Sequence, residues 1–288
     1  MKIDKWSLFE ISREKINFTR GYGLDHNFEL LTQILPVGSA PGQSVKCAMV
    51  DNIVFFSYLK MNGQKGVGIT LGFGPEEIPN TYLGFLPKMK SFLETNPPDS
   101  APLDINPEKI SLPPSIKIRD FDSAIFSLVT GFPTVILGNE AEILELMQVI
   151  DFSIPQELRA RFRFVTQSTS LSENVNIIGM PFSEEVLSEL NVSKGKYTIV
   201  VLGDRTYGQL SSKLCKKIAN HLVKGEYNQI SDLLLDFYQL ATESDELLPS
   251  LTFADKYRLH LSDAQLALIL RAKHFDKQVP DGLGIVEV

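Results

Sequence analysis

The clearest alternation of apolar and polar positions lies between residues 52 and 73. In Lys65–Phe73 one face carries Val67, Ile69, Leu71 and Phe73, and the other carries Gly66, Gly68, Thr70 and Gly72. Asn52–Lys60 is a second strand-like run, and Met61–Gln64 between the two contains Asn-Gly, a favoured pair for a type I′ turn. The pattern predicts a β-hairpin whose glycine-lined face is closely packed by another element.

Two further elements are predicted in the N-terminal part. Trp6–Ile11 has the composition of a strand, and Tyr82–Leu93 has apolar residues at helical spacing. Pro87 inside the second segment predicts either a kink or a helix that begins at that proline. Antiparallel strands with a packing helix indicate an α+β unit over residues 1–95.

A proline-rich stretch separates this unit from the rest of the chain. Residues 96–114 hold six of the 16 prolines. Proline fixes φ, removes a backbone donor and biases the preceding residue towards extended geometry. We therefore expect a linker over residues 96–115.

From residue 116 onwards, short apolar strands alternate with amphipathic helices. The predicted strands are Thr134–Leu137, Arg161–Thr166, Asn176–Ile178 and Tyr197–Leu202. The predicted helices are Glu140–Ile150, Glu184–Leu190 capped by Ser183, Gln209–Val223, Tyr227–Ala241 and Asp263–Lys273. This rhythm is typical of an α/β fold with a partly parallel sheet between helical layers, and predicts a three-layer domain over residues 116–288 with a helical C-terminal end.

Composition narrows the class of protein. The formal net charge is −7 and the pI about 5.2, which argues against general nucleic-acid binding. Cys47 and Cys215 are the only cysteines and are expected to be buried, reduced thiols. The N-terminus does not resemble a signal peptide, and no apolar run reaches the length of a membrane span. We therefore expect a cytoplasmic protein.

Cofactor and catalytic motifs are not recognisable. Gly66–Gly74 has the wrong glycine spacing for a dinucleotide loop, so no cofactor is predicted. No G-x-S-x-G nucleophile motif occurs, and none of the four histidines has metal-ligand spacing. Asp120 and Asp122 are better explained as an acidic turn before a helix than as a metal site. The sequence favours a protein without catalytic activity and leaves an enzyme open.

Gly203–Gly208, with the sequence GDRTYG, is the best candidate for anion binding. It follows the strongest predicted strand and is expected to open a helix, whose backbone N–H groups would point outwards. Gly203, Arg205, Thr206 and Gly208 would form this site, with Arg205 adding positive charge. A P-loop is excluded because Gln209 and Leu210 follow Gly208. A plain strand-to-helix connection is the alternative.

Arginines gather at Arg159, Arg161 and Arg163. If the strand forms as predicted, Arg161 and Arg163 share one face, and Phe162 and Phe164 share the other. Such a pair would bind an acidic surface or a phosphate, so we predict a partner-binding patch that includes Arg159, Arg161, Arg163 and Arg205. The alternative is a solvated face.

Two segments resemble parts of known GTPase regulators. Asn52–Leu93 resembles a longin hairpin with its packing helix, and Pro133–Gly203 resembles the α/β core of a DENN domain. The latter, with IPQELRARFRFVT, is also similar to bacterial GTPase-associated proteins. The resemblance implies a longin-like domain over residues 1–95, a DENN-like domain over residues 116–288, and a small Ras-superfamily GTPase as the partner.

Such regulators act in two ways. Exchange factors work by surface contact, whereas activating proteins often supply an arginine finger. Residues 21–118 contain no arginine, so only Arg13 or Arg20 would qualify as a finger. The expectation is an exchange factor, adaptor or scaffold. A phosphate- or nucleotide-binding enzyme using Gly203–Gly208, or a structural subunit of a larger complex, are the alternatives.

Overall fold

A computed structural model describes most of the first 202 residues and a few short segments beyond them. The described residues are 1–12, 15–24, 28–36, 40–95, 101–108, 133–154, 156–171, 175–192, 197–202, 205–207, 220–221, 224–226 and 229–230. The predicted helices Gln209–Val223, Tyr227–Ala241 and Asp263–Lys273 lie almost wholly outside these residues, as do Arg13 and Cys215.

The N-terminal half contains antiparallel strands with a helix on each side. Its main strands are β2 (Lys5–Ser12), β3 (Lys15–Tyr22), β4 (Gly42–Val50), β5 (Ile53–Asn62) and β6 (Lys65–Phe73). Its helices are α1 (Phe28–Ile34), the short 3-10 helix η1 (Leu83–Phe85) and α2 (Leu86–Thr95). The sequence predicts a kink at Pro87 or a helix that begins there. The structure has the second, since α2 begins at Leu86, next to Pro87.

The C-terminal half alternates strands with helices, as predicted. Its strands are β8 (Thr134–Gly138), β9 (Phe164–Val165), β10 (Ile177–Pro181), β11 (Thr198–Val201) and β12 (Arg205–Tyr207). Between them lie α4 (Glu140–Ser153), the 3-10 helix η2 (Gln156–Arg161) and α5 (Glu184–Val192). Strands β9, β10, β8 and β11 pair in parallel with one another, whereas β12 pairs antiparallel with β11, which confirms an α/β fold with a mixed sheet.

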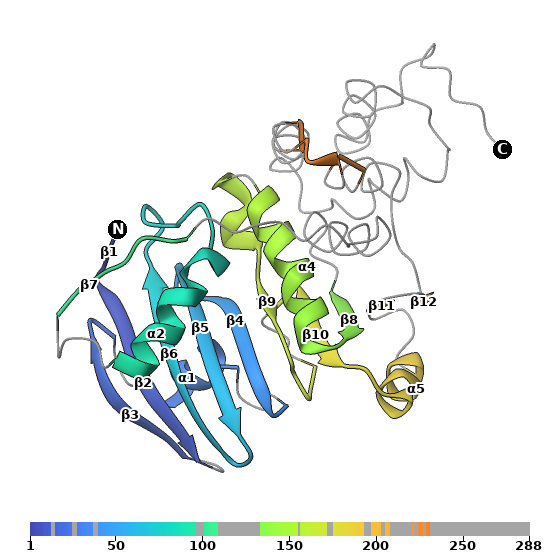
Figure 1. Cartoon of the computed structure of the whole chain (residues 1–288), viewed down its shortest axis with the longest axis horizontal. Coiled ribbons are helices and arrows are strands. Elements are labelled where there is room, and N and C mark those ends of the chain that lie inside the picture. Colours follow the sequence, from blue (N-terminus) through green and yellow to red (C-terminus); the bar gives the residue numbers. More distant parts are fainter. Residues whose placement is uncertain are drawn as a thin grey trace.

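One ten-stranded sheet runs through both halves (Figure 1). Its order is β12-β11-β8-β10-β9-β4-β5-β6-β2-β3. The halves meet where β9 pairs antiparallel with β4, at Lys46 opposite Val165 and Cys47 opposite Phe164. The sheet therefore continues across the proline-rich stretch that separates the two halves in sequence.

Two tight turns set the register of the central strands. The β5–β6 hairpin forms as predicted, but Asn62 pairs with Lys65, so the turn residues are Gly63 and Gln64. Of these only Gly63 has positive φ, at 61°. Asp51 and Asn52, with φ of 49° and 62°, form the type I′ turn that joins β4 to β5. Asn52 was expected to begin a strand and instead lies in this turn.

The proline-rich stretch is partly fixed to the N-terminal half. β7 (Leu103–Asp104) pairs antiparallel with β1 (Lys2–Ile3). Leu103 and Ile105 are buried, and the indole Nε1 of Trp6 donates to the Ala101 carbonyl at 2.7 Å. Residues 101–108 therefore form part of the N-terminal half.

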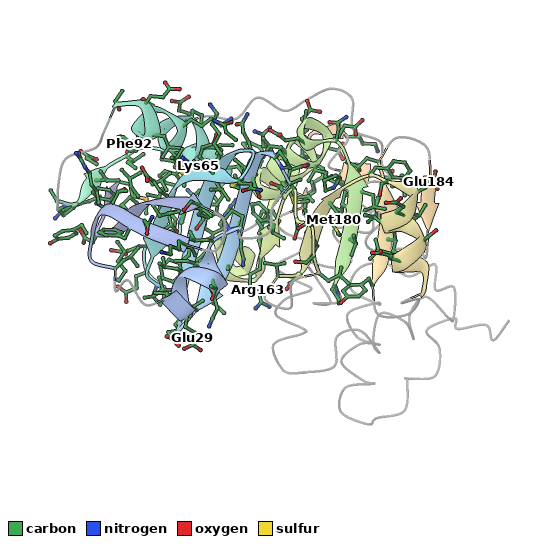
Figure 2. All side chains as sticks on the ribbon, turned by 90° about the horizontal axis from the view of Figure 1, so that it is seen from below. Glu29, Lys65, Phe92, Arg163, Met180 and Glu184 are labelled. Carbon is green, nitrogen blue, oxygen red and sulfur yellow. The ribbon has the colours of Figure 1, made fainter. Side chains whose placement is uncertain are left out.

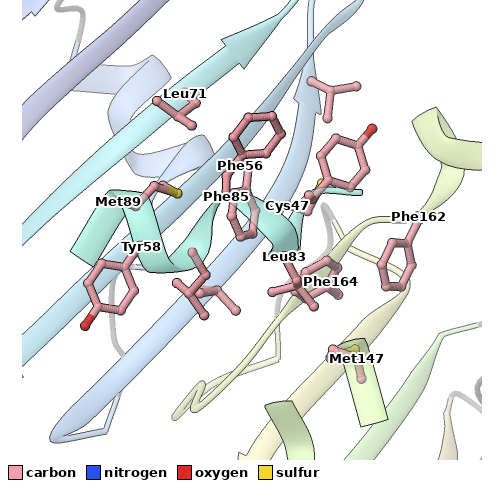
Figure 3. Close-up of a cluster of buried hydrophobic side chains, with 14 of the residues drawn as sticks. Cys47, Phe56, Tyr58, Leu71, Leu83, Phe85, Met89, Met147, Phe162 and Phe164 are labelled. Carbon is pink, nitrogen blue, oxygen red and sulfur yellow. The ribbon is translucent and has the colours of Figure 1, made fainter. Parts of the chain in front are cut away.

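The largest hydrophobic core lies on the side of the sheet that carries α2 and α4 (Figure 3). Phe56, Phe85 and Met89 of the N-terminal half pack in the same cluster as Met147 and Phe164 of the C-terminal half. On the other side, α1 packs on β2 and β5, and α5 packs on β8 and β10. Figure 2 shows Glu29 of α1 and Phe92 of α2 on opposite sides of the sheet.

The glycine-lined face of β6 is closely packed, as predicted. A Cβ on Gly68 would lie 2.3 Å from the ring of Phe9, and one on Gly72 would lie 3.0 Å from Phe55. Aromatic side chains of the neighbouring strands occupy the space above these glycines, and α1 covers them. No helix among the described residues is long and apolar enough to cross a membrane.

Candidate functional site

Arg159, predicted to contact a partner, is instead a buried residue of the core. Its side chain is 3% exposed, and its Nη1 lies 2.6 Å from Oδ1 of Asp151. Nη2 donates to the carbonyls of Asp151 and Ile154. The guanidinium also lies over the ring of Tyr82, 5.9 Å from its centroid. A guanidinium with this many internal partners is not available to another protein, so Arg159 does not belong to the predicted patch.

Asp151 connects the two halves of the molecule. Its carboxylate accepts hydrogen bonds from Thr81 Oγ1 at 2.6 Å and from the backbone N–H groups of Tyr82 and Leu83 at 3.2 and 2.9 Å. Those donors stand at the start of η1 in the N-terminal half, where backbone N–H groups have no partner within the helix. The buried pair of Asp151 and Arg159 thereby caps an element far away in sequence. No sequence pattern pointed to Asp151.

A second polar contact joins the halves at the start of α4. Glu140 Oε2 accepts from the backbone N–H of Gln43 at 3.2 Å, and Gln43 Oε1 accepts from the hydroxyl of Tyr58 at 3.1 Å. Burial, followed by the charges of Glu140 and Glu94, raises the pKa of Tyr58 to about 12. Tyr58 is therefore a neutral hydrogen-bond donor at ordinary pH.

Arg161 and Arg163 do not share the face of a strand. Arg161 ends η2, and β9 spans only Phe164 and Val165. The strand is shorter than predicted because the residues up to Arg161 belong to η2, in which the Arg159 side chain donates to the carbonyls of Asp151 and Ile154. The predicted alternation persists in part, since Phe162 and Phe164 are both buried and their rings lie 4.6 Å apart.

Of the patch arginines whose side chains are described, Arg159 is buried and Arg163 has an exposed part. Its side chain is half-buried, and its Nε is enclosed without a hydrogen-bond partner. Figure 2 shows it at the side of the sheet where α1 lies. The side chain of Arg161 lies outside the described residues.

The predicted anion site at Gly203–Gly208 has a different backbone from the one expected. Arg205, Thr206 and Tyr207 form β12, which pairs antiparallel with β11. The segment therefore returns along the sheet where the start of a helix was expected. Thr206 and Tyr207 have high strand propensity, and they pair with Val200 and Ile199 of β11. Gly203, Gly208 and the side chains of Arg205 and Thr206 lie outside the described residues.

The strands near this segment are followed, at their carboxyl ends, by acidic residues. β8 ends at Gly138, and α4 follows at once with Glu140 and Glu142 in its first turn. Asn139 and Glu142 form a capping box, with bonds of 3.0 and 3.1 Å, that satisfies the backbone N–H groups of these two residues. α5 also begins with two glutamates. Carboxylates in these positions repel an anion, so the described surroundings do not favour phosphate binding.

The two candidate arginine fingers belong in sequence to the region of β2 and β3. Arg13 falls between these strands and outside the described residues. Arg20 lies in β3, opposite Leu8, and its side chain is partly exposed. The structure therefore does not bring Arg20 to Arg163.

Two buried groups have perturbed pKa values but structural roles. Burial lowers the pKa of Lys46 to about 8, and its Nζ donates to the Leu35 carbonyl just after α1, at 3.3 Å. Burial raises the pKa of Cys47 well above 9.0, so this thiol is buried and protonated, as expected. Both side chains are enclosed, without access to a substrate.

One histidine–carboxylate pair occurs within the described part of the chain. His221 Nδ1 lies 2.6 Å from Glu226 Oε2, and Glu226 N also donates to the His221 carbonyl at 3.0 Å. Both contacts close the same local turn, which gives the pair a structural explanation. No group of three His, Cys, Asp or Glu side chains in the described ranges is arranged to hold a metal ion.

Comparison with known proteins does not assign a family. The chain matches none of the protein-family models and none of the curated protein sequences.

Proposed function

We propose that this chain is a protein-binding regulator or scaffold of a small Ras-superfamily GTPase, acting in the manner of an exchange factor or adaptor. The order of elements supports the proposal. The β5–β6 hairpin is followed by α2 on the same sheet, and then by strands that alternate with α4 and α5. These are the segments whose sequences resemble longin and DENN units.

The observation that carries the proposal is the continuity between the two halves. β4 pairs with β9, and the buried Asp151–Arg159 pair holds the start of η1 through the backbone N–H groups of Tyr82 and Leu83. The result is one broad and firmly connected surface. A regulator that acts by surface contact needs such a surface and no catalytic side chain of its own.

Arginine distribution favours exchange or scaffolding over activation by a finger. The N-terminal half has arginines only at positions 13 and 20, and Arg20 lies in the middle of a strand. A finger must extend into the nucleotide site of the partner, and a residue within a strand is poorly placed for this. Arg163 would then serve as a surface contact to an acidic partner.

The test is a nucleotide-exchange assay on a panel of purified Ras-superfamily GTPases loaded with fluorescent GDP. We expect the full chain to bind at least one of them and to change its GDP release. Arg163→Glu should weaken that binding, while Lys224→Glu, a reversal at another exposed site, should not. Absence of binding to every GTPase in the panel, in all nucleotide states, would contradict the proposal.

Two outcomes would point elsewhere. A rise in melting temperature with phosphate or nucleotide that is lost in Arg205→Ala would favour the nucleotide- or phosphate-binding enzyme. Capture of a fixed set of unrelated proteins from native lysate, unaffected by nucleotide, would favour a structural subunit.

A further inference from the structure

Strand β3 is an edge strand with an exposed surface. It ends the sheet order, and no described element pairs with its outer side (Figure 1). It spans eight residues, and none of them is fully buried. An edge strand presents a row of backbone N–H and C=O groups that can pair with another extended chain. Proline, which often blocks such edges, does not occur in it.

The two faces of β3 differ in chemistry. Ile16 and Phe18 are paired with Ile11 and Phe9 of β2, so they extend the apolar face that packs under α1. Phe18 is 36% exposed. Lys15 and Arg20 are paired with Ser12 and Leu8 and therefore lie on the opposite face, which carries α2.

The α2-bearing face next to β3 is basic. Lys60 and Glu10 both pair with Val67, and Lys65 pairs with Ser12, so these side chains share one face by strand alternation. They border a hollow of about 420 Å³, whose lining from this face is Glu10, Ser12, Lys60, Asn62, Lys65 and Val67 and which also reaches Ile11 and Gly66. We call Lys15, Arg20, Lys60 and Lys65 the basic shelf. On this face of β2, β3, β5 and β6 the only carboxylate is Glu10.

We propose that β3 accepts an extended segment of another protein by strand addition, and that this segment alternates acidic with apolar residues. Its backbone would pair with the outer edge of β3. Its acidic side chains would lie over the basic shelf, and its apolar side chains would continue the row of Ile16 and Phe18. Backbone pairing supplies affinity in this mode of recognition, and alternate side chains supply specificity.

The charge of β3 favours a segment of another protein over a second copy of this chain. The chain as a whole has a net charge of −7, yet β3 holds two cations and no carboxylate. A second copy of this chain pairing through β3 would bring like charges together, which is unfavourable across strands. An acidic segment of a different protein is complementary. The proposal does not depend on that protein being a GTPase.

The β2–β3 register offers a substitution that blocks the edge. Leu8 pairs with Arg20 and Phe9 pairs with Phe18, so Thr19 is an extra residue without a partner in β2. Thr19→Pro therefore places a proline in the edge strand at the one position without a register partner in β2, where pairing to β2 loses least. Lys15→Glu reverses an exposed charge of the basic shelf and leaves the backbone intact. Lys224→Glu is the matched charge control, exposed and outside the N-terminal half.

The experiment is selection of a phage-displayed library of random 12-residue peptides on the full chain, followed by fluorescence anisotropy of a synthetic enriched peptide. We expect enriched peptides to alternate Asp or Glu with apolar residues. Lys15→Glu should weaken binding by about fivefold, the scale of one exposed charge pair, and added salt should weaken it further. Thr19→Pro should abolish binding, and Lys224→Glu should leave it unchanged.

Several results would overturn the proposal. These are failure to enrich any peptide, enrichment of basic or non-alternating peptides, and equal binding to wild type and to Lys15→Glu. Sedimentation that shows a homodimer lost in Thr19→Pro would identify a second copy as the occupant and would equally reject a foreign acidic strand. Circular dichroism confirms that each variant is folded, and Lys15→Glu keeps the test decisive if Thr19→Pro is not.

Discussion

At the scale of single residues, the buried pair of Asp151 and Arg159 is the most consequential feature of the structure. Two charges removed from water are costly unless they are paired and hydrogen-bonded. Here the Asp151 carboxylate accepts four hydrogen bonds and the Arg159 guanidinium donates three. The pair thus joins α4, η2 and the start of η1 at one point. Removing one partner would leave the other charge buried without its countercharge, which lowers the free energy of unfolding.

We expect Arg159→Met to destabilise the protein by about 3–5 kcal/mol, because Asp151 would stay buried without its countercharge. Asp151→Asn should also be destabilising, because it leaves the Arg159 cation buried without its countercharge and replaces one acceptor oxygen by an NH2 group. The double variant should cost less than the sum of the two, as interacting sites do. Urea unfolding of the four proteins measures these values. Strict additivity would show that the two side chains do not interact.

Lys46 gives a prediction about pH. Burial lowers its pKa in the folded protein to about 8, against 10.5 for the unfolded chain. Between these values the unfolded state binds more protons, so this residue makes the free energy of unfolding rise with pH, by about 3 kcal/mol over the window. Below pH 8 its buried charge is a penalty.

Lys46→Met removes both the penalty and the pH dependence. We expect the variant to be more stable than wild type at pH 7, with an advantage that shrinks as pH rises from 8 to 10. Other titrating groups, including Cys47, are present in both proteins and cancel in the difference. Urea unfolding across this range measures it. A difference that is constant with pH would show that Lys46 titrates normally.

At the scale of elements, the glycines of β6 permit close packing. A Cβ on Gly68 would lie 2.3 Å from Phe9 and 2.5 Å from the Tyr58 carbonyl, which is backbone and cannot move aside. We expect Gly68→Ala to cost about 1–3 kcal/mol by overpacking. Gly74→Ala is the control, because its Cβ would meet only Glu77, at 3.3 Å. Thermal unfolding distinguishes the two, and equal melting temperatures would contradict the packing argument.

The sequence predicted those elements whose pattern is local. The β5–β6 hairpin, α4 with its acidic first turn, and β11 all follow from alternation, capping and β-branched composition. Strands β3 and β4 were missed. β3 is exposed on both faces and therefore lacks a hydrophobic period. The signal for the β4–β5 turn was the pair Asp51–Asn52, whose residues both tolerate positive φ.

The candidate site was predictable only in part, because its residues are defined by contacts distant in sequence. Arg159 has the same residue type and spacing as its neighbours, and only Asp151 and Tyr82 make it a core residue. The same pair shortens the strand that was predicted around Arg161. The prediction for Gly203–Gly208 rested on the strand that precedes it in sequence, whereas the backbone of Arg205–Tyr207 depends on pairing with β11.

At the scale of the whole molecule, the shared sheet and core indicate that the two halves unfold together. Trp6, the single tryptophan, is fully buried in the N-terminal half and reports on it alone. Arg159 lies in the C-terminal half. If the halves form one cooperative unit, Arg159→Met should shift the unfolding midpoint seen by Trp6 fluorescence as far as the midpoint seen by far-ultraviolet circular dichroism.

The control for this prediction is Glu185→Ala, at an exposed position of α5 that should shift neither midpoint. An unchanged Trp6 midpoint in Arg159→Met, together with a second dichroism transition at lower denaturant, would mean that the halves are independent domains joined by a weak interface. Coincident shifts would mean that a partner bound to either half stabilises both. Binding at the β3 edge and binding near Arg163 would then be coupled through global stability, even without direct contact between the two surfaces.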